Sequence, residues 1–140
     1  NAPGLTPAKK PYMLKDLKRL AEYYKFTLKM PADFPVRTVL AMRVLSSLTP
    51  EKIPPAAHKL FNAYWVDNLD IADPAVVSEL IGQEAVERAG LHEVKDSLFK
   101  TTEEAVQRGA FGAPTFFVGD EMFFGHDRMN LLEQYLMNAL

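Results

Sequence analysis

The feature that most constrains the fold is a short apolar hairpin pattern near the C-terminus. Thr115 to Val118 is a run of β-branched and aromatic residues, and Met122 to Phe124 is a second apolar run. The polar stretch Gly119 to Glu121 separates them. This composition and this short connection predict two antiparallel strands joined by a tight turn.

Aromatic side chains fall on both faces of the predicted hairpin: Phe116, Phe117, Phe123 and Phe124. A lone hairpin is marginally stable, and one that is apolar on both faces needs a layer on each side and a strand beside it. The remaining sequence predicts helices but no third strand. Residues 1–11 are proline-rich and resemble a loop from the middle of a protein. We therefore expect the partner strands upstream of Asn1.

Upstream of the hairpin, the apolar residues recur at helical spacing. Helices are predicted over Tyr12–Tyr24, Val36–Leu48, Ala56–Val66, Pro74–Ile81, Glu84–Ala89 and Glu93–Arg108. Asp73 before Pro74 combines an acidic N-cap with a proline at the first helical position. Gly90 and Gly109 are expected to end the helices before them. A last amphipathic helix is predicted over Arg128–Ala139.

Composition excludes several classes of protein. The 140 residues suit one domain, and a net charge of −2 with mixed signs lacks the basic stripe of a nucleic-acid-binding protein. No run of about 18 apolar residues predicts a membrane span. The chain has no cysteine, and its three histidines have no metal-like spacing, so we expect neither a thiolate nor a metal site.

The dipeptide Ala113-Pro114 stands at the entrance to the first strand. Proline cannot donate a ladder hydrogen bond, so it is confined to strand starts and edges. About one X-Pro bond in twenty is cis, so an ordinary strand-initiating proline is the commoner case. If this bond is cis, the backbone of Ala113 turns away from the sheet and could pair with an extended peptide.

The stretch Gly125-His126-Asp127 precedes the last predicted helix. Asp127 is a good N-cap residue, and the free N–H groups of a helix start favour a carboxylate. The Asp127 carboxylate could also accept from an ammonium group. This end could therefore hold both charges of an α-amino acid, although a plain helix cap is the commoner role of such an aspartate.

A third feature is the pair Lys9 and Lys10, which lies between prolines. Adjacent lysines usually form a solvated loop face. A lysine in a proline-restricted loop is less mobile and could fix a carboxylate as a point charge.

Together these features resemble the kappa-class glutathione transferases and the similar 2-hydroxychromene-2-carboxylate isomerases. The similarity extends over essentially the whole chain. Its most specific parts are Gly109 to Pro114 and Phe124 to Arg128. Further similar positions are Asn1-Ala2-Pro3, Pro7-Ala8-Lys9, Tyr12-Met13, Ala41-Met42-Arg43, Trp65 with Asp70-Ile71, and Thr101 to Glu103.

The resemblance implies an α/β fold, namely a thioredoxin-like domain into which an all-α domain is inserted. Residues 1–11 would be a connecting loop of the thioredoxin-like domain. Residues 12–108 would form the mainly helical insertion, whose last helix leads back. Residues 109–140 would supply the C-terminal half of the thioredoxin-like domain, with the hairpin and the final helix.

The resemblance also implies a glutathione site. Ala113 would pair its backbone with the cysteinyl unit beside Pro114, and Asp127 with His126 would hold the γ-glutamyl end. The glutathione-binding lysine falls on Lys9 by its spacing from Tyr12, whereas counting from the start of the chain favours Lys10.

Two further roles come from the same resemblance. Asn1 matches an asparagine that lies near the thiol. The catalytic serine of these enzymes falls in a strand-helix-strand segment that would lie upstream of Asn1, so the 140 residues alone are expected to be inactive and poorly stable. For a second substrate, the candidates are Trp65 and Arg43.

Several functions fit. An isomerase would add the glutathione thiolate to an aromatic enone-acid, allow a bond to rotate and release the thiolate, in aromatic catabolism. A transferase would leave glutathione attached to an electrophile. A DsbA-like disulfide oxidoreductase, with its Cys-x-x-Cys outside these residues, also fits, as does a non-catalytic helical interaction domain. We expect a homodimer in the bacterial cytoplasm, or a mitochondrial or peroxisomal protein in a eukaryote.

Overall fold

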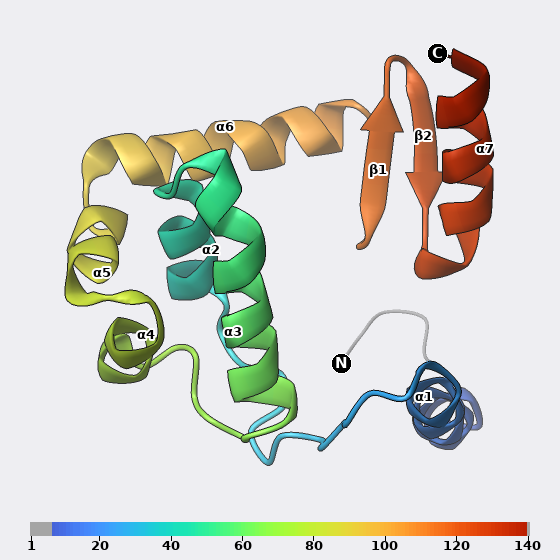
Figure 1. The fold of residues 1–140 in the computed structure, drawn as a ribbon, viewed down its shortest axis with the longest axis horizontal. Coiled ribbons are helices and arrows are strands. Elements are labelled where there is room, and N and C mark those ends of the chain that lie inside the picture. The colour runs from blue at the N-terminus through green and yellow to red at the C-terminus, as the bar shows by residue number, and fades with distance from the viewer. Residues whose placement is uncertain (1–6, 140) are drawn as a thin grey trace. The chain divides into compact units, whose positions relative to one another are not determined.

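The computed structural model describes residues 7–139, apart from the side chains of Lys10 and Ala139. The chain divides into two compact units at Lys95 and Asp96. This division falls inside helix α6 (His92–Gln107), so α6 contributes to both units. The helices and strands of each unit are labelled in Figure 1. The three-part domain division expected from the sequence stays a prediction.

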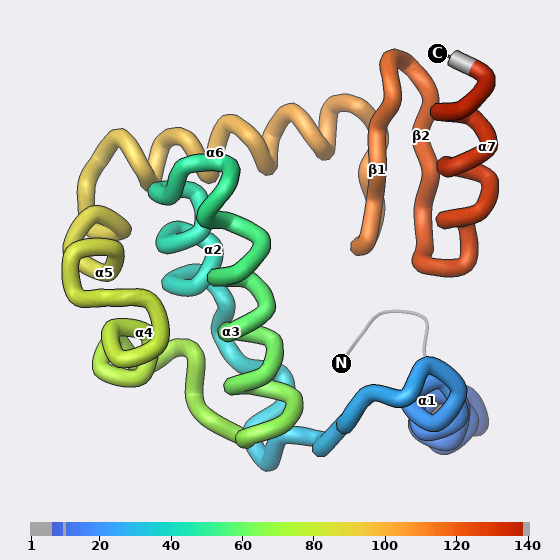
Figure 2. The backbone as a smooth tube through the Cα atoms, in the orientation of Figure 1, coloured from blue at the N-terminus to red at the C-terminus, as the bar shows by residue number. Residues whose placement is uncertain are grey.

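In its described residues, the regular elements of the first unit are all helices. Its elements are α1 (Lys9–Tyr24), α2 (Val39–Ser46), the 3-10 helix η1 (Pro50–Lys52), α3 (Ile53–Trp65), α4 (Pro74–Ile81) and α5 (Gln83–Ala89). Helix α2 packs on α3 and α5, and α4 packs on the same two helices; their path can be followed in Figure 2. The core between them includes Val44 and Val77, both fully buried.

Several helix ends follow the sequence closely. Helix α4 occupies the predicted residues, and the Asp73 carboxylate caps it by accepting from the Ala75 N–H at 2.8 Å. Helix α5 ends before Gly90. Gly109, which follows α6, adopts a φ of 95°, a backbone conformation that favours glycine.

Two helices begin three residues earlier than predicted, so their predicted starts were wrong. Helix α1 begins at Lys9 instead of Tyr12, and α3 begins at Ile53 instead of Ala56. The prolines that suggested loops, Pro11 in α1 and Pro54 and Pro55 in α3, lie in first helical turns. N–H groups there have no acceptor within the helix, so proline loses no hydrogen bond.

Helix α2 is shorter than predicted. It begins at Val39 instead of Val36 and ends at Ser46 instead of Leu48. The Val36 N–H donates to the hydroxyl of Tyr64 on α3 at 3.3 Å. Residues 36–38 therefore run along α3 in a non-helical conformation, a tertiary contact that helical spacing cannot reveal.

The second unit contains the hairpin and the last helix. Strands β1 (Thr115–Val118) and β2 (Glu121–Phe124) pair antiparallel, with Phe116 opposite Phe123. The prediction of this hairpin is confirmed. Helix α7 (Met129–Ala139) follows, and its Tyr135 ring lies 5.6 Å from the ring of Phe123. Helix α7 therefore packs on the face of the hairpin that carries Phe123.

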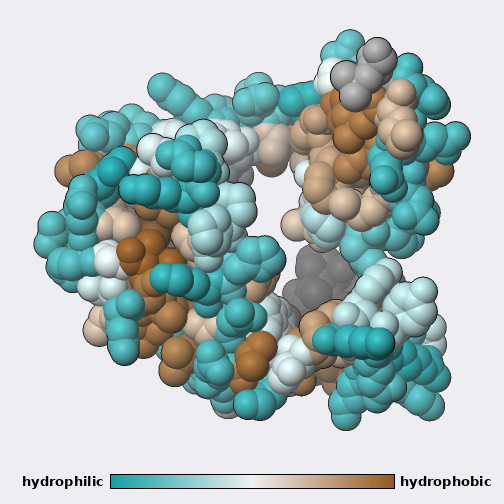
Figure 3. Space-filling view, viewed as in Figure 1, coloured by the Kyte–Doolittle hydropathy of each residue, from teal (hydrophilic) through white to brown (hydrophobic). Residues whose placement is uncertain are grey.

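The opposite face of the hairpin is also apolar, as the sequence predicts. The guanidinium of Arg108 lies 4.0 Å from the centre of the Phe117 ring, and it donates to the Gly119 carbonyl at 2.6 Å. The rings of Phe111 and Phe124 lie 4.5 Å apart, and both side chains remain exposed. Figure 3 shows apolar side chains, coloured brown, gathered over the hairpin and α7.

Within residues 7–139, the sheet consists of β1 and β2 alone. No helix in this part of the chain is both long enough and apolar enough to cross a membrane.

Candidate functional site

The loop that enters β1 has a well-defined geometry. The Ala113–Pro114 peptide bond is cis, so the less common of the two possible isomers is the one observed. The Thr115 hydroxyl donates to the Gly112 carbonyl at 2.6 Å, which closes the loop around this bond. A Cβ atom at Gly112 would lie 2.8 Å from the Phe124 ring. The loop can therefore approach β2 this closely only with glycine at that position.

Strand β1 has an open edge that begins at Ala113. The Gly125 N–H donates to the Pro114 carbonyl at 2.9 Å, which extends the ladder by one residue. Hydrogen-bonded and non-bonded positions alternate in antiparallel pairs, so Thr115 and Phe117 direct their N–H and carbonyl groups away from β2. Neither backbone group of Ala113 has a partner among the described residues. This edge can therefore bind an extended peptide backbone.

At the same end of the hairpin, β2 leads into α7 through a 3-10 turn, η2 (His126–Arg128). The prediction that Asp127 is the N-cap was wrong, because Asp127 lies inside this turn, which begins after Gly125. One Asp127 oxygen accepts from the Arg128 guanidinium at 2.7 Å, and neither oxygen caps a helical N–H. Because the η2 turn extends to Arg128, the final α-helix begins at Met129 instead of Arg128.

The turn leaves three polar groups available to a ligand. The other Asp127 carboxylate oxygen has no hydrogen-bond partner among the groups that the structure describes, and the side chain is 60% exposed. The backbone N–H groups of His126 and Asp127 likewise donate to none of these groups. A carboxylate can accept from an ammonium group, and free N–H groups at a helix start can donate to a carboxylate.

Gly125 brings these groups together. Its φ is 104°, which side chains disfavour, and a Cβ at this position would lie 2.5 Å from Asp127 Oδ1. The carboxylate therefore occupies the space that a side chain would fill. The exposed imidazole of His126 forms no side-chain hydrogen bond in the described part of the chain, so only its backbone contributes to this geometry.

Two further predicted glutathione contacts, Lys9 and Asn1, do not belong to the hairpin site. Lys9 is exposed at the first position of α1, in the first unit. Ala113, Pro114, His126 and Asp127 belong to the second unit. The role of Lys9 stays a prediction, and so does the choice between Lys9 and Lys10. Asn1 lies outside the described residues.

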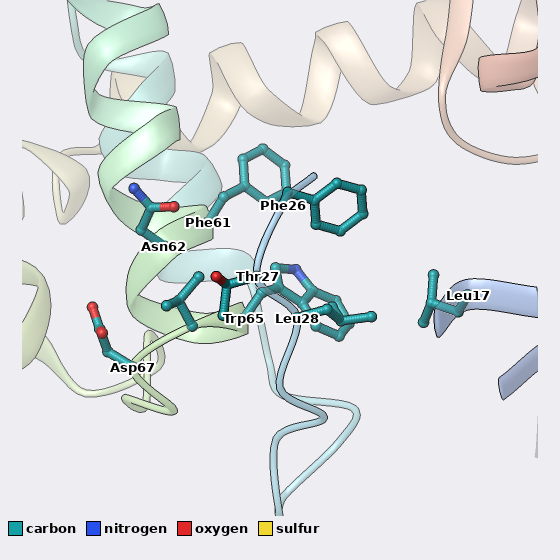
Figure 4. Close-up of a pocket in the computed structure, with 9 residues that line it drawn as sticks. Leu17, Phe26, Thr27, Leu28, Phe61, Asn62, Trp65 and Asp67 are labelled. Atoms are coloured by element: carbon teal, nitrogen blue, oxygen red, sulfur yellow. The ribbon is translucent and has the colours of Figure 1, made fainter. Parts of the chain in front are cut away.

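Trp65, one of the two substrate candidates, lines two hollows of the first unit. One is an open cleft of about 670 Å³. Figure 4 shows the side chains of Phe26, Phe61 and Trp65 gathered there with Leu28, and Asn62 and Asp67 farther off. The other is an apolar cavity of about 280 Å³ that Phe34, Tyr64 and Trp65 help to line.

Arg43, the other substrate candidate, lines neither hollow. Its Nε atom is buried without a hydrogen-bond partner in the described part of the chain. The structure therefore does not bring Arg43 together with Trp65 at either cavity. The Phe61-x-x-Tyr64-Trp65 cluster was a sequence signal for an aromatic cavity, but spacing alone does not distinguish such a cluster from ordinary core.

No group of three or more His, Cys, Asp or Glu side chains within residues 7–139 could hold a metal ion. The candidate site at the end of the hairpin consists of backbone groups and a single carboxylate, a composition suited to a small peptide.

Comparison with known proteins identifies relatives with a thioredoxin-like fold. The family model of the DSBA-like thioredoxin domain matches residues 1–137. Glutathione S-transferase kappa 1 of Homo sapiens is 35% identical over 96% of this chain and 69% of its own length. The 2-hydroxychromene-2-carboxylate isomerase of Pseudomonas sp. (strain C18) is 34% identical over 91% of this chain and 63% of its own length.

Solved structures agree with these similarities. A 2-hydroxychromene-2-carboxylate isomerase superposes with a TM-score of 0.79 at 28% identity, covering 94% of this chain and 68% of that chain. A putative protein disulfide isomerase from Nitrosomonas europaea reaches 0.73 at 20% identity, covering 96% of this chain and 76% of that chain, which indicates a shared fold only. The chain spans 63% to 69% of the length of the two sequence relatives named above.

Proposed function

Because the chain belongs to the DSBA-like thioredoxin family, together with kappa-class glutathione transferases and 2-hydroxychromene-2-carboxylate isomerases, we propose that it is part of a glutathione-dependent enzyme. Our first candidate reaction is the isomerase type. The relatives are named as enzymes, and the thioredoxin-like fold expected from the sequence is confirmed. Glutathione as the ligand and the particular reaction are proposals.

The observation that carries the proposal is the geometry of one end of the hairpin. Unpaired backbone groups of Ala113 lie at the open edge of β1, and the Asp127 carboxylate lies in the turn after β2. In the hairpin register, position 113 falls opposite position 126. A short extended peptide could therefore pair with Ala113 along its backbone and reach the η2 turn with its amino-acid end.

These groups match the chemistry of glutathione. The Ala113 N–H and carbonyl would pair with the cysteinyl unit, which fixes the position of its sulfur. The Asp127 carboxylate would accept from the γ-glutamyl ammonium group. The N–H groups of His126 and Asp127 would donate to its α-carboxylate. Glutathione would supply a thiolate that reacts with an electrophilic carbon.

The transferase reaction, as a second candidate, rests on a specific finding. The human kappa-class enzyme is 35% identical to this chain, as similar as the isomerase at 34%. Both reactions need the same peptide-binding groups, so the site at Ala113 and Asp127 supports them equally. A disulfide oxidoreductase has weaker support, because the structure that bears such a name is 20% identical and therefore shows the fold alone.

Calorimetry with glutathione tests the proposal. We expect measurable heat at millimolar glutathione, and we expect Asp127→Asn to weaken binding about tenfold. The expected loss corresponds to about 1.4 kcal/mol, close to the lower end of the range for a hydrogen bond to a charged group. Asp120→Asn removes an equally charged side chain from the turn at the other end of the hairpin and should leave the affinity unchanged.

Absence of both heat and thermal stabilisation at millimolar glutathione would contradict the proposal. Equal affinities of the Asp127→Asn variant and the unmodified protein would contradict the role of the carboxylate.

A further inference from the structure

Asp127 is held by its neighbour Arg128 at two points. Arg128 Nη1 donates to Asp127 Oδ2 at 2.7 Å and to the main-chain carbonyl of Asp127 at 3.3 Å. The guanidinium therefore joins the side chain of Asp127 to its own backbone. Because one planar group contacts both acceptors, it restricts the rotation of the carboxylate.

This contact also determines which carboxylate oxygen stays available. Oδ2 is taken by Arg128, whereas Oδ1 lies 2.5 Å from the position that a Cβ of Gly125 would take. The Gly125 N–H donates to the Pro114 carbonyl at 2.9 Å. The free oxygen Oδ1 therefore lies beside the backbone of the residue that pairs with the cis-proline.

A positive charge at position 128 does not help the final helix to form. Arg128 lies in η2, immediately before Met129, the first residue of α7. The N-terminal end of a helix carries a partial positive charge, so a cation there is unfavourable. The ion pair with Asp127 offsets this only weakly, because both side chains are more than half exposed. The stability of α7 therefore does not account for the contact, whereas the orientation of Asp127 does.

We propose that Arg128 is a positioning residue of the glutathione site, which holds the Asp127 carboxylate so that Oδ1 meets the ammonium group of the γ-glutamyl unit. The inference rests on the proposed glutathione-dependent function. A carboxylate that is already oriented loses less rotational freedom when the ligand binds.

The charge of Arg128 has a smaller net effect than the orientation it imposes. The guanidinium repels the ammonium group of the γ-glutamyl end and attracts the α-carboxylate on the same carbon atom. At an exposed site, where water and salt screen both interactions, these two effects largely cancel. Removing Arg128 should therefore weaken glutathione binding through Asp127.

The orientation of Asp127 can be measured on the full chain without a ligand. Three-bond couplings from Asp127 Cγ to the backbone nitrogen and to the carbonyl carbon report its χ1 rotamer. We expect a single rotamer in the unmodified protein and averaged couplings in Arg128→Met, which removes the guanidinium and keeps an unbranched side chain. Averaged couplings in the unmodified protein, or unchanged couplings in the variant, would overturn the inference.

A double-mutant cycle followed by calorimetry with glutathione separates positioning from direct contact. We expect Arg128→Met to weaken binding about threefold, as for the loss of an exposed charge pair, and to have no further effect in an Asp127→Ala background. The midpoint of thermal unfolding should stay unchanged or rise slightly, because a cation is removed from a helix start. Equal losses in both backgrounds would mean that Arg128 acts on the ligand itself, which would overturn the positioning role.

Arg19→Met is the matched control. Arg19 pairs with Asp16 at 3.6 Å on α1, in the first unit, and both side chains are exposed to a similar degree. This variant should leave the affinity and the Asp127 couplings unchanged. If the unmodified protein binds glutathione and only Asp127→Ala weakens it, the inference fails and the glutathione function stands. If the unmodified protein binds no glutathione, both are contradicted.

Discussion

Replacing Gly125 with alanine is expected to lower the affinity for glutathione at least about tenfold and to destabilise the hairpin unit by about 1–3 kcal/mol. The new Cβ would lie 2.5 Å from Asp127 Oδ1, so the carboxylate must move. The φ of 104° at this position is also unfavourable for alanine. Calorimetry with glutathione and thermal unfolding measure the two effects.

Gly119→Ala is the matched control for this change. Gly119 also has a positive φ, of 58°, but no atom lies within 4 Å of the position its Cβ would take. It occupies the turn at the other end of the hairpin. This variant should lose some stability and keep its affinity. If Gly119→Ala and Gly125→Ala weakened glutathione binding equally, the proposed role of the η2 turn in binding would be contradicted.

The second large effect is expected at Leu132 of α7. This side chain is 8% exposed, whereas the neighbouring Leu131 is 52% exposed. Leu132→Ala should lower the free energy of unfolding by about 2–5 kcal/mol, because it removes a buried side chain and leaves a cavity. Since leucine and alanine are both good helix formers, little of this loss would come from helix propensity.

Leu131→Ala makes the identical chemical change one residue earlier and should alter stability by about 0.5 kcal/mol or less. Denaturant titration of both variants measures the difference. A loss at Leu131 as large as the loss at Leu132 would mean that α7 packs on the hairpin through a different face.

Local signals predict much of the fold. The β-branched and aromatic runs around Gly119 indicate the hairpin, and the Asp73-Pro74 start indicates α4. In each case the determining interaction lies within a few residues. Asp73, for example, caps α4 through the N–H of Ala75, two residues away.

Errors arise where one residue type permits two local structures. Pro11, Pro54 and Pro55 suggest loops by their composition but lie in first helical turns, which tolerate proline. Asp127 suggests a helix N-cap, but it lies inside the η2 turn, which begins after Gly125. The identity of the proline or aspartate does not decide between the two local structures, because the residue is stable in both.

The candidate site is partly predictable for a similar reason. The Ala113 and Asp127 positions can be identified from their motifs, but the free backbone groups at His126 depend on how the turn folds. The apolar cavity that Tyr64 and Trp65 help to line was not predicted, because the contact between Val36 and Tyr64 spans 28 positions in the chain. Homodimer formation and the cellular compartment stay predictions from the resemblance.

The most direct test of the glutathione site is a titration with glutathione followed in ¹H–¹⁵N spectra. We predict that the largest shifts fall on the amides of Ala113, Thr115, His126 and Asp127. We also predict that these amides titrate together with a single dissociation constant. The absence of shifts at these four amides at about 10 mM glutathione, or shifts confined to other parts of the chain, would contradict the proposal that this end of the hairpin binds glutathione.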